Sequence, residues 1–293
     1  MSKKISAGIC GQPFTITDLE RMRQIIRDNP GKNRLGLSRI ICNEMGWKAA
    51  NGKLKEMSCR VAMLKLWREG FIELPPAQKN NNKGIKKYSI TSLSDPGFPI
   101  EKSIKEIKSI ELVMVNQPST SRLWNELIER YHYLGFKPLA GAQLRYLIYC
   151  TAGLLGAISF SASAWKIAPR DNWIGWDHKT RKGNLHLIIN NSRYLILPWV
   201  KVKHLASKLL SICAKQISRD WQERYAYQPV LLETFVEKDR FLGTCYKAAN
   251  WVYVGQTQGR GKKDVHNQYA LPIKDIWRYP LAKDFRERLR GIK

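Results

Sequence analysis

The stretch from Leu231 to Asp264, LLETFVEKDRFLGTCYKAANWVYVGQTQGRGKKD, has the apolar pattern of a strand, a short helix and a second strand. We expect strands over Val230–Val236 and Trp251–Val254, with a helix over Phe241–Ala249 between them. The stretch also concentrates more reactive and polar groups than packing requires. These are Glu233, Cys245, Tyr246, Asn250 and a Gly-Arg-Gly turn. It therefore predicts a functional site at the end of an α/β domain.

The sequence before this stretch alternates helical and extended segments. We expect helices at Ser121–Tyr131, Lys179–Leu187 and Leu205–Ile217, strands at Gln143–Thr151, Leu154–Phe160 and Tyr194–Val202, and a polar loop at Ala168–Trp176. The two strands beside Gly153 are joined by a tight turn, so we expect them to pair antiparallel. This order predicts an α/β domain with a mixed sheet over residues 119–293.

The order of the last elements resembles that of a GNAT-type acyltransferase. In that family a strand ends in a loop whose amides bind cofactor pyrophosphate at the start of a helix, and a strand, a short helix with a tyrosine and a last strand follow. Val200–Leu210, Leu231–Val236, Tyr246 and Trp251–Gly255 have this order. The glycine-rich turn is replaced by Lys203–Ser207 (KHLAS), and without glycine the backbone approaches a pyrophosphate less readily. Coenzyme A is therefore not expected as a cofactor.

Residues 1–95 predict a separate helical module. Thr17 and Glu20 have the spacing of a capping box, which begins a helix that ends before Pro30. A second helix is expected to end at Gly46, and a third is expected over Leu54–Arg68. The inner side of the third helix is expected to carry Val61, Leu64 and Trp67.

A basic hairpin is expected after the third helix. Phe71–Pro75 and Tyr88–Ile90 have strand-like patterns, and Lys79–Lys87 (KNNNKGIKK) suits the tip between them. This is the order of a winged helix-turn-helix, which would place the third helix in a major groove and the wing on phosphates. A three-helix bundle with a solvated basic face is the alternative. Residues 96–118 are expected to form a linker.

The net charge of +26 favours a polyanionic partner, because neutralised phosphates release counterions. Double- or single-stranded DNA is the expected partner. Contacts are expected from Lys53, Lys55, Arg60, Lys65, Lys83, Lys86, Lys87, Arg170, Trp173, Arg193, Arg260, Lys262 and Lys263. No apolar stretch approaches the roughly 20 residues that span a membrane. No signal segment opens the chain, so a cytoplasmic protein without membrane contact is expected.

Glu233 is the first candidate for chemistry. It lies in an otherwise apolar strand, where a buried carboxylate requires a cationic, hydrogen-bonding or metal partner. Together with Asp171 and Asp264 it would hold a divalent ion such as Mg²⁺ for phosphodiester chemistry. The alternative is a structural ion pair of Glu233 with Arg170 or Arg193.

Cys245, Tyr246 and His132 offer other chemistry. A cysteine at the start of a helix can have a lowered pKa and act as a nucleophile, and Tyr246 could donate a proton or attack phosphorus. His132 could exchange protons near neutral pH. Packing roles for Cys245 and His132 are the alternatives. The six cysteines show no CxxC or Cys/His spacing, so neither disulfides nor a zinc site is expected.

Two further features suit nucleic acid. Gly255–Lys263 combines glycines with cations that suit phosphate contacts, with a solvated turn as the alternative. Four tryptophans could stack on bases: Trp165, Trp173, Trp176 and Trp199. Trp173 and Trp176 are the better candidates because they lie in the predicted polar loop.

Long phrases of the larger domain match a known pattern. They are RYHYLG at Arg130–Gly135, GAQLRYLI at Gly141–Ile148, FSASAWKIAPRDNWIGW at Phe160–Trp176, NNSRYLILPWV at Asn190–Val200, and LLETFV, GTCYKAANW and GQTQGRGKKD in the stretch quoted first. Together they resemble the DruA family, a component of Druantia anti-phage systems, over roughly Leu123–Asp264. The resemblance implies work on invading DNA with other defence proteins as partners, and relatives also occur with mobile elements. It supplies no catalytic residues.

Three functions remain open on the sequence alone. The first is a DNA-binding anti-phage defence protein whose α/β domain cleaves DNA strands or modifies bases, with Glu233 central. The second is a transposase- or recombinase-like DNA processor with an acidic metal site or a tyrosine nucleophile. The third is a non-catalytic DNA sensor that recruits partners and uses Glu233 only as a structural residue.

Overall fold

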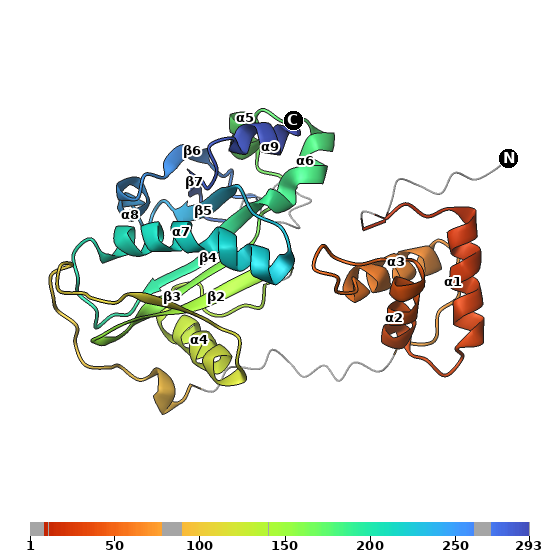
Figure 1. Cartoon of the computed structure of the whole chain (residues 1–293), viewed down its shortest axis with the longest axis horizontal. Helices are drawn as coiled ribbons and strands as arrows, with labels where there is room; N and C mark the ends of the chain where they lie inside the picture. The colour runs from red at the N-terminus through yellow and green to blue at the C-terminus, as the bar shows by residue number, and fades with distance from the viewer. Residues whose placement is uncertain (1–8, 11, 78–89, 140, 261–270, 293) are drawn as a thin grey trace. The chain divides into compact units, whose positions relative to one another are not determined.

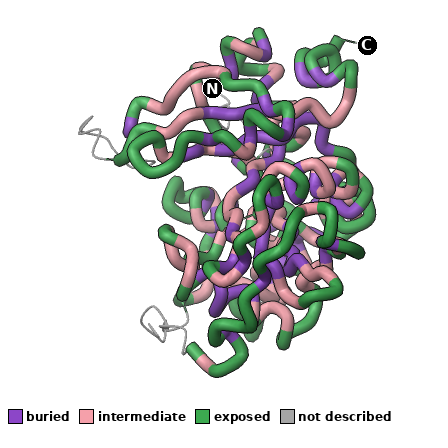
Figure 2. Tube along the Cα trace, turned by 90° about the vertical axis from the view of Figure 1, so that its left-hand side faces the viewer, coloured by how far each residue is buried: buried purple, intermediate pink, exposed green. Residues whose placement is uncertain are grey.

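The structure is a computed structural model that describes residues 9–10, 12–77, 90–139, 141–260 and 271–292. The chain folds into two compact units, residues 1–86 and 87–293, which we call the helical unit and the sheet unit (Figure 1). Buried positions, purple in Figure 2, run along the strands and along one side of the longer helices. In the described residues no helix combines the length and apolar character that crossing a membrane requires.

The helical unit contains α1 (Ile16–Asp28), α2 (Arg34–Glu44) and α3 (Glu56–Arg68). Thr15 caps α1: its hydroxyl accepts the Asp18 N–H at 3.1 Å, and the Asp18 carboxylate accepts the Thr15 N–H at 2.8 Å. The capping box predicted at Thr17 is therefore wrong. Thr15 has the extended backbone that an N-cap needs, whereas Thr17 already lies inside the helix.

The inner face of α3 also differs from the prediction. Val61 and Trp67 are 50% and 43% exposed, and the buried side chains of α3 are Cys59, Ala62, Met63 and Leu66. These smaller or flexible side chains recur at spacings of three and four residues, so they form one helix face against the core of the unit. Val61 and Trp67 lie outside that face.

The winged helix is not confirmed. Residues 71–77 form no strand, and the predicted wing tip and return strand fall mostly on residues 78–89, which lie outside the described residues. Residues 45–55 join α2 to α3 through a bridge between Lys48 and Leu54. This connection is longer than the roughly 3- to 4-residue turn of a helix-turn-helix motif.

The sheet unit contains a seven-stranded sheet in the order β1-β2-β3-β4-β5-β7-β6. Its strands are β1 (Glu111–Met114), β2 (Gln143–Cys150), β3 (Gly153–Ala162), β4 (Ile188–Ile196), β5 (Leu231–Glu237), β6 (Val252–Gln256) and β7 (Lys274–Pro280). The β4–β5 pair is parallel and the other pairs are antiparallel. The predicted mixed α/β fold and the β2–β3 hairpin are thereby confirmed.

The helices of the sheet unit are α4 (Pro118–Tyr131), α5 (Ala168–Ile174), α6 (His178–Asn184), α7 (Leu205–Tyr225), α8 (Thr244–Ala248) and α9 (Phe285–Arg290), with short 3-10 turns η1 (Ser92–Ser94) and η2 (Leu185–Leu187). The long helix α7 buries Leu209, Cys213, Ile217 and Trp221 in the main core. Their spacing of three to four residues explains why α7 packs on the sheet along its length.

Three sequence predictions for this unit need correction. Residues 96–118, predicted as a linker, contribute β1 and place Ile100 in a parallel bridge with Val200. The predicted polar loop at Ala168–Trp176 contains helix α5, and β4 begins six residues before Tyr194, at Ile188. Polar Asn190, Asn191 and Ser192 inside β4 explain the error at the start of that strand, because they obscure an alternating strand pattern.

The register of β4 determines where the sheet opens. β4 and β5 pair only from Ile188–Leu231 to Asn191–Thr234, after which each strand continues beside its other neighbour. The β3–β4 register also shifts at this point, so that Ser192 is an extra residue opposite Ser159 and Phe160. The two parallel strands therefore separate and leave a wedge between them.

The capping of α1 gives a test of the helical unit. Thr15→Ala should destabilise α1 by about 1 kcal/mol because it leaves a helix N–H without its partner. Hydrogen exchange of α1 amides in the full chain would measure this loss. Thr17→Ala is the matched control and should leave exchange almost unchanged; the reverse order would contradict the capping geometry.

Candidate functional site

The wedge between β4 and β5 contains a cavity of about 540 Å³, which we call the wedge pocket. It is lined by residues 131–134, 191–196, 234–236 and 240–246. The end of α4, two diverging strands and the start of α8 thus contribute its walls. Three of the predicted catalytic residues line this pocket: His132, Cys245 and Tyr246. The predicted nucleic-acid contact Arg193 lines it as well.

Tyr246 lies in the buried wall of the wedge pocket. Its hydroxyl donates to Asn191 Oδ1 at 2.8 Å and accepts from Thr234 Oγ1 at 3.5 Å. The Asn191 amide donates to the Ser159 and Arg193 carbonyls, both at 3.1 Å, so its position is fixed by the bulge in β4. Burial raises the pKa of Tyr246, and the phenol therefore keeps its proton at neutral pH.

His132 follows α4 directly and is a neutral donor. Its Nδ1 accepts the Leu134 N–H at 3.2 Å, which assigns the ring proton to Nε2. Burial, followed by the charge of Arg193, lowers the pKa of His132 to about 4. The imidazole is therefore uncharged at neutral pH, with its free proton on the nitrogen that has no backbone partner. The expected proton exchange near neutrality is wrong because the ring is desolvated.

Cys245 is not an activated nucleophile in this structure. Burial raises the pKa of its thiol, so the lowered value predicted from its place in a helix is wrong. The helix α8 is only five residues long, and desolvation outweighs the backbone contacts that favour the thiolate. Cys245 remains a wall of the wedge pocket.

Arg193 brings a positive charge into the wedge pocket. Its Nη1 donates to the Ser192 carbonyl at 2.7 Å and its Nε to the Gly135 carbonyl at 3.4 Å. Burial lowers the pKa of Arg193, and Tyr133 opposes this shift. Arg240 stacks over the Tyr133 ring at 5.0 Å at the same pocket, beside Glu237 at 3.7 Å.

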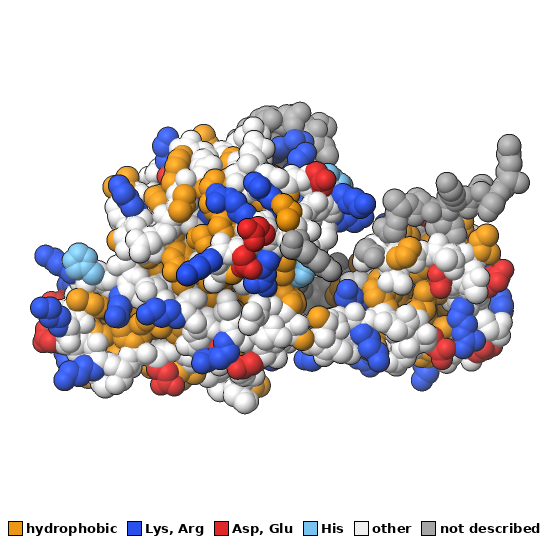
Figure 3. Space-filling model, turned by 45° about the horizontal axis from the view of Figure 1, so that its top comes forward, with side chains coloured by type: hydrophobic (Ala, Val, Ile, Leu, Met, Phe, Trp, Pro, Cys, Tyr) orange, Lys and Arg blue, Asp and Glu red, His pale blue; other side chains and the backbone are white. Residues whose placement is uncertain are grey.

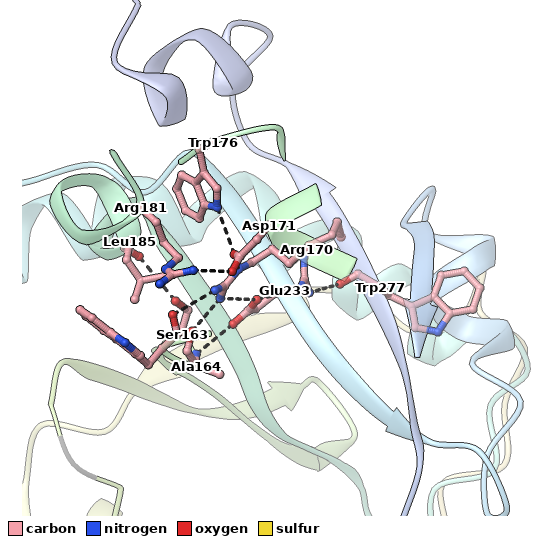
Figure 4. Close-up of polar contacts among 11 residues, drawn as sticks. Ser163, Ala164, Arg170, Asp171, Trp176, Arg181, Leu185, Glu233 and Trp277 are labelled. Atoms are coloured by element: carbon pink, nitrogen blue, oxygen red, sulfur yellow. Dashed lines mark hydrogen bonds and ion pairs between the residues drawn. The ribbon is translucent and has the colours of Figure 1, made fainter. Parts of the chain in front are cut away.

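Glu233 lies instead in a second group, the buried ion cluster of Arg170, Asp171, Arg181, Glu233 and Arg278 (Figure 4). Its carboxylate is fully buried and contacts Arg278 Nη2 at 3.0 Å and Arg170 Nη1 at 3.5 Å. Its other oxygen accepts the Ala164 N–H at 3.2 Å. These contacts form the ion pair with Arg170 that was the alternative prediction for Glu233, and its second partner is Arg278 instead of Arg193.

Asp171 and Glu233 lie close together, as predicted, but arginine bridges them. Arg170 Nε contacts Asp171 at 2.9 Å, Arg181 Nη1 contacts it at 2.9 Å, and Trp176 Nε1 donates to it at 3.0 Å. Within the described residues, no three His, Cys, Asp or Glu side chains are placed to hold a metal ion. Asp264, the third predicted ligand, lies outside the described residues.

The other predicted contacts are divided between the two units. Lys53, Lys55 and Lys65 are exposed in the helical unit, and Arg60 there is half-buried with Nη2 at 3.6 Å from Met57 Sδ. Arg260 is exposed in the sheet unit. Five predicted lysines lie outside the described residues: Lys83, Lys86, Lys87, Lys262 and Lys263.

Three of the four candidate tryptophans are half-buried in the sheet unit. Trp173 stacks on Phe285 with ring centres 5.4 Å apart, Trp176 donates to Asp171, and Trp199 contacts Tyr131 at 5.3 Å. Trp165 is the exposed one, at 56%. Trp176 uses its indole N–H for Asp171, whereas Trp173 lines a surface pocket beside Gly255, so stacking by these two rings stays a prediction.

The sequence missed Asn191, Arg240 and Arg278. Asn191 had a usable signal, since it belongs to a short polar run between the two apolar ends of the strand. Arg278 had none, because it lies in β7, which pairs with β5 through a register that sequence patterns do not reveal. Burial lowers the pKa of Arg278 to about 10, opposed by the charge of Glu233.

The buried ion cluster predicts a large stability effect. Glu233→Gln should destabilise the sheet unit by about 3–5 kcal/mol, because it leaves buried guanidinium groups without their counter-charge. Chemical denaturation followed by tryptophan fluorescence would measure it. Glu237→Gln, on the same strand but in a more solvated pair with Arg240, should cost at most about 1 kcal/mol. Equal stability of the two variants would contradict the structural role of Glu233.

The sheet unit has fold neighbours among solved acetyltransferases, at low similarity. An acetyl transferase that modifies the N-terminal serine of ribosomal protein L7/L12, from Salmonella typhimurium, is 10% identical over 48% of this chain and 64% of that chain, with a TM-score of 0.31. The chain thus spans just under two thirds of that protein. The ribosomal-protein-S18-alanine N-acetyltransferase from Escherichia coli is 8% identical over 59% and 95% of the two chains, with a TM-score of 0.36.

A third neighbour is the aminoglycoside acetyltransferase AAC(6')-Ib in complex with coenzyme A, at 13% identity over 61% and 98% of the two chains and a TM-score of 0.39. No curated protein matches the chain. The family model described as Druantia protein DruA matches residues 65–270, well over half of the chain. This match confirms the resemblance found in the sequence, and the chain belongs to the DruA family.

Proposed function

We propose that this chain is a nucleic-acid-binding component of an anti-phage defence system, and that the wedge pocket receives an anionic group of the nucleic acid. The observation that carries the proposal is the state of Arg193. Its guanidinium lines the pocket and donates to two carbonyls, and no carboxylate of the described residues lies within ion-pair distance of it. A desolvated cation without a counter-charge is unfavourable, and an incoming anion relieves that cost.

The composition of the chain supports a phosphate among the possible anions. The net charge is +26, from 50 lysine and arginine against 24 aspartate and glutamate residues, and basic side chains outnumber acidic ones on the side of the sheet unit shown in Figure 3. The rim of the wedge pocket carries exposed Tyr133 and Phe241, whose rings meet at 5.3 Å, and Arg240 stacks on Tyr133. Aromatic rings beside guanidinium groups suit a base and its phosphate.

The walls of the wedge pocket offer proton donors. The phenol of Tyr246 and the neutral imidazole of His132 both keep their protons at neutral pH. Such donors stabilise negative charge that develops on a bound group. Tyr246 would exchange its bond to Asn191 for one to the substrate. In this proposal Tyr246 replaces Glu233 as the residue that serves a reaction on DNA, because Glu233 is held by Arg170 and Arg278 in the buried ion cluster.

The helical unit supplies a second contact in the proposal. Helix α3 exposes Lys65 and Arg68, and Lys53 and Lys55 are exposed just before it. Met57 and Val61 are also exposed on α3. Cations beside small apolar side chains suit phosphate contacts together with contacts to thymine methyl groups in a groove.

A second candidate function is acyl transfer from coenzyme A, which one observation favours. His204 has a φ of +64° at the start of α7, so this turn takes the left-handed conformation that glycine would supply. No side chain caps α7, and its first N–H groups suit a phosphate. The sequence argument against coenzyme A was that this turn has no glycine. The backbone conformation no longer supports that argument, and what remains of it is that the Cβ atoms of the turn keep a pyrophosphate farther from the backbone.

The Arg193→Gln variant tests the proposed function. Anisotropy titrations with single- and double-stranded oligonucleotides should show affinity at least about 10-fold weaker, and a salt slope smaller by about 0.7–0.9 if Arg193 contacts one phosphate. Arg219→Gln removes the same charge from an exposed position on α7 and should change affinity little. Equal effects of the two variants, or no binding by the unmodified chain, would contradict the proposal. Displacement of the oligonucleotide by coenzyme A would favour the second candidate.

A further inference from the structure

Trp165 is the most exposed of the ten tryptophans, at 56%. The exposed part of a large aromatic ring gains little for stability, and tryptophan is enriched at binding interfaces because its ring offers a large contact area. The guanidinium of Arg181 lies over the Trp165 ring, 6.0 Å from the ring centre. One face of the indole thus lies near a cation, and the exposure leaves ring surface open to a ligand.

The backbone on both sides of this ring is held by the buried ion cluster. Arg170 Nη1 donates to the Ala164 carbonyl at 2.7 Å, and Nη2 donates to the Trp165 carbonyl at 3.3 Å. The Ala164 N–H donates to Glu233 at 3.2 Å. Figure 4 shows Ala164 beside Glu233 and Arg170. The segment that carries the exposed ring is therefore anchored to fully buried charged groups.

The choice of charged groups for this anchor is informative. A buried ion cluster is rarely more stabilising than apolar packing of the same volume. Its particular effect here is to fix the backbone around Trp165, because its hydrogen bonds hold two successive carbonyls and one N–H in place. A ring held in advance loses little conformational entropy when a ligand stacks on it.

The charges near the ring select the ligand. Three arginines and two carboxylates form the buried ion cluster, which gives it one excess positive charge close to the indole. Lys166, next in the chain, and Lys182, next to Arg181, are exposed. A flat ring beside the Arg181 guanidinium and an excess of positive charge fits a flat ligand that carries negative charge.

We infer that Trp165 is a stacking platform for an unpaired nucleobase in a single-stranded segment of nucleic acid. The base must be unpaired because both faces of a base inside a duplex are covered by its neighbours. The inference rests on the proposed function and adds a second contact outside the wedge pocket. It assigns Glu233 and Arg170 as positioning residues for this platform.

The test compares Trp165→Ala with the unmodified full chain on two single-stranded oligonucleotides, one with all its bases and one with abasic sites throughout. The variant should bind the base-bearing strand about 10-fold or more weakly, and the abasic strand as the unmodified chain does. The salt slope should not change, because no charge is removed. Phe98→Ala, which removes a 94% exposed aromatic ring from the same unit, is the control and should bind like the unmodified chain.

Each result decides a separate point. Equal loss on both strands, or no loss on either, would overturn the stacking platform. Binding by the unmodified chain that Arg193→Gln weakens and Trp165→Ala does not would overturn this inference alone. Absence of binding by the unmodified chain would overturn both the inference and the proposed function.

Discussion

The pairing of the Glu233 carboxylate with Arg278 and Arg170 joins three parts of the sheet unit that are distant in sequence. Glu233 lies in β5, Arg278 in β7 opposite it, and Arg170 in α5. The same arginine holds the Ala164 and Trp165 carbonyls and the Asp171 carboxylate, which in turn binds Arg181 of α6. Removing any of these partners would leave a buried charge unpaired, which is costly. Arg170 therefore fixes where α5 and α6 lie on the sheet.

The wedge pocket follows from a different constraint, the end of the parallel pairing between β4 and β5. Asn191 is the last residue of β4 that pairs with β5. Its side-chain amide donates to the two carbonyls at the bulge and accepts from the Tyr246 hydroxyl. The pocket therefore has a rigid polar wall beside an aromatic rim. The anchor and the pocket lie on the same strand, since Glu233 is followed directly by Thr234, which lines the pocket. One strand thus carries the buried anchor and a wall of the pocket at adjacent positions.

Sequence patterns found the elements that carry their own signals. Gly153, with a φ of +126°, marks the β2–β3 turn, and the apolar run of β5 needs no partner to be recognised. Helix α5 was missed because Pro169 and Gly175 suggest a loop, although they are a first-turn proline and a left-handed C-cap. Of the candidate site, the sequence predicted His132, Arg193, Cys245 and Tyr246, which the fold brings together. The sequence could not show that Glu233 lies in a different group. The role of Glu233 depends on Arg278, which lies in β7, and the pairing of β7 with β5 is a long-range contact that sequence patterns do not reveal.

The central claim is that nucleic acid occupies the wedge pocket while Glu233 stays buried beneath the surface. Photochemical cross-linking of the full chain to single-stranded DNA that carries a photoreactive base, followed by peptide mass spectrometry, tests it most directly. We expect cross-links on peptides that contain residues 131–134 or 240–246, which line the pocket. Cross-links confined to other surfaces of the sheet unit, with none on these peptides, would contradict the account.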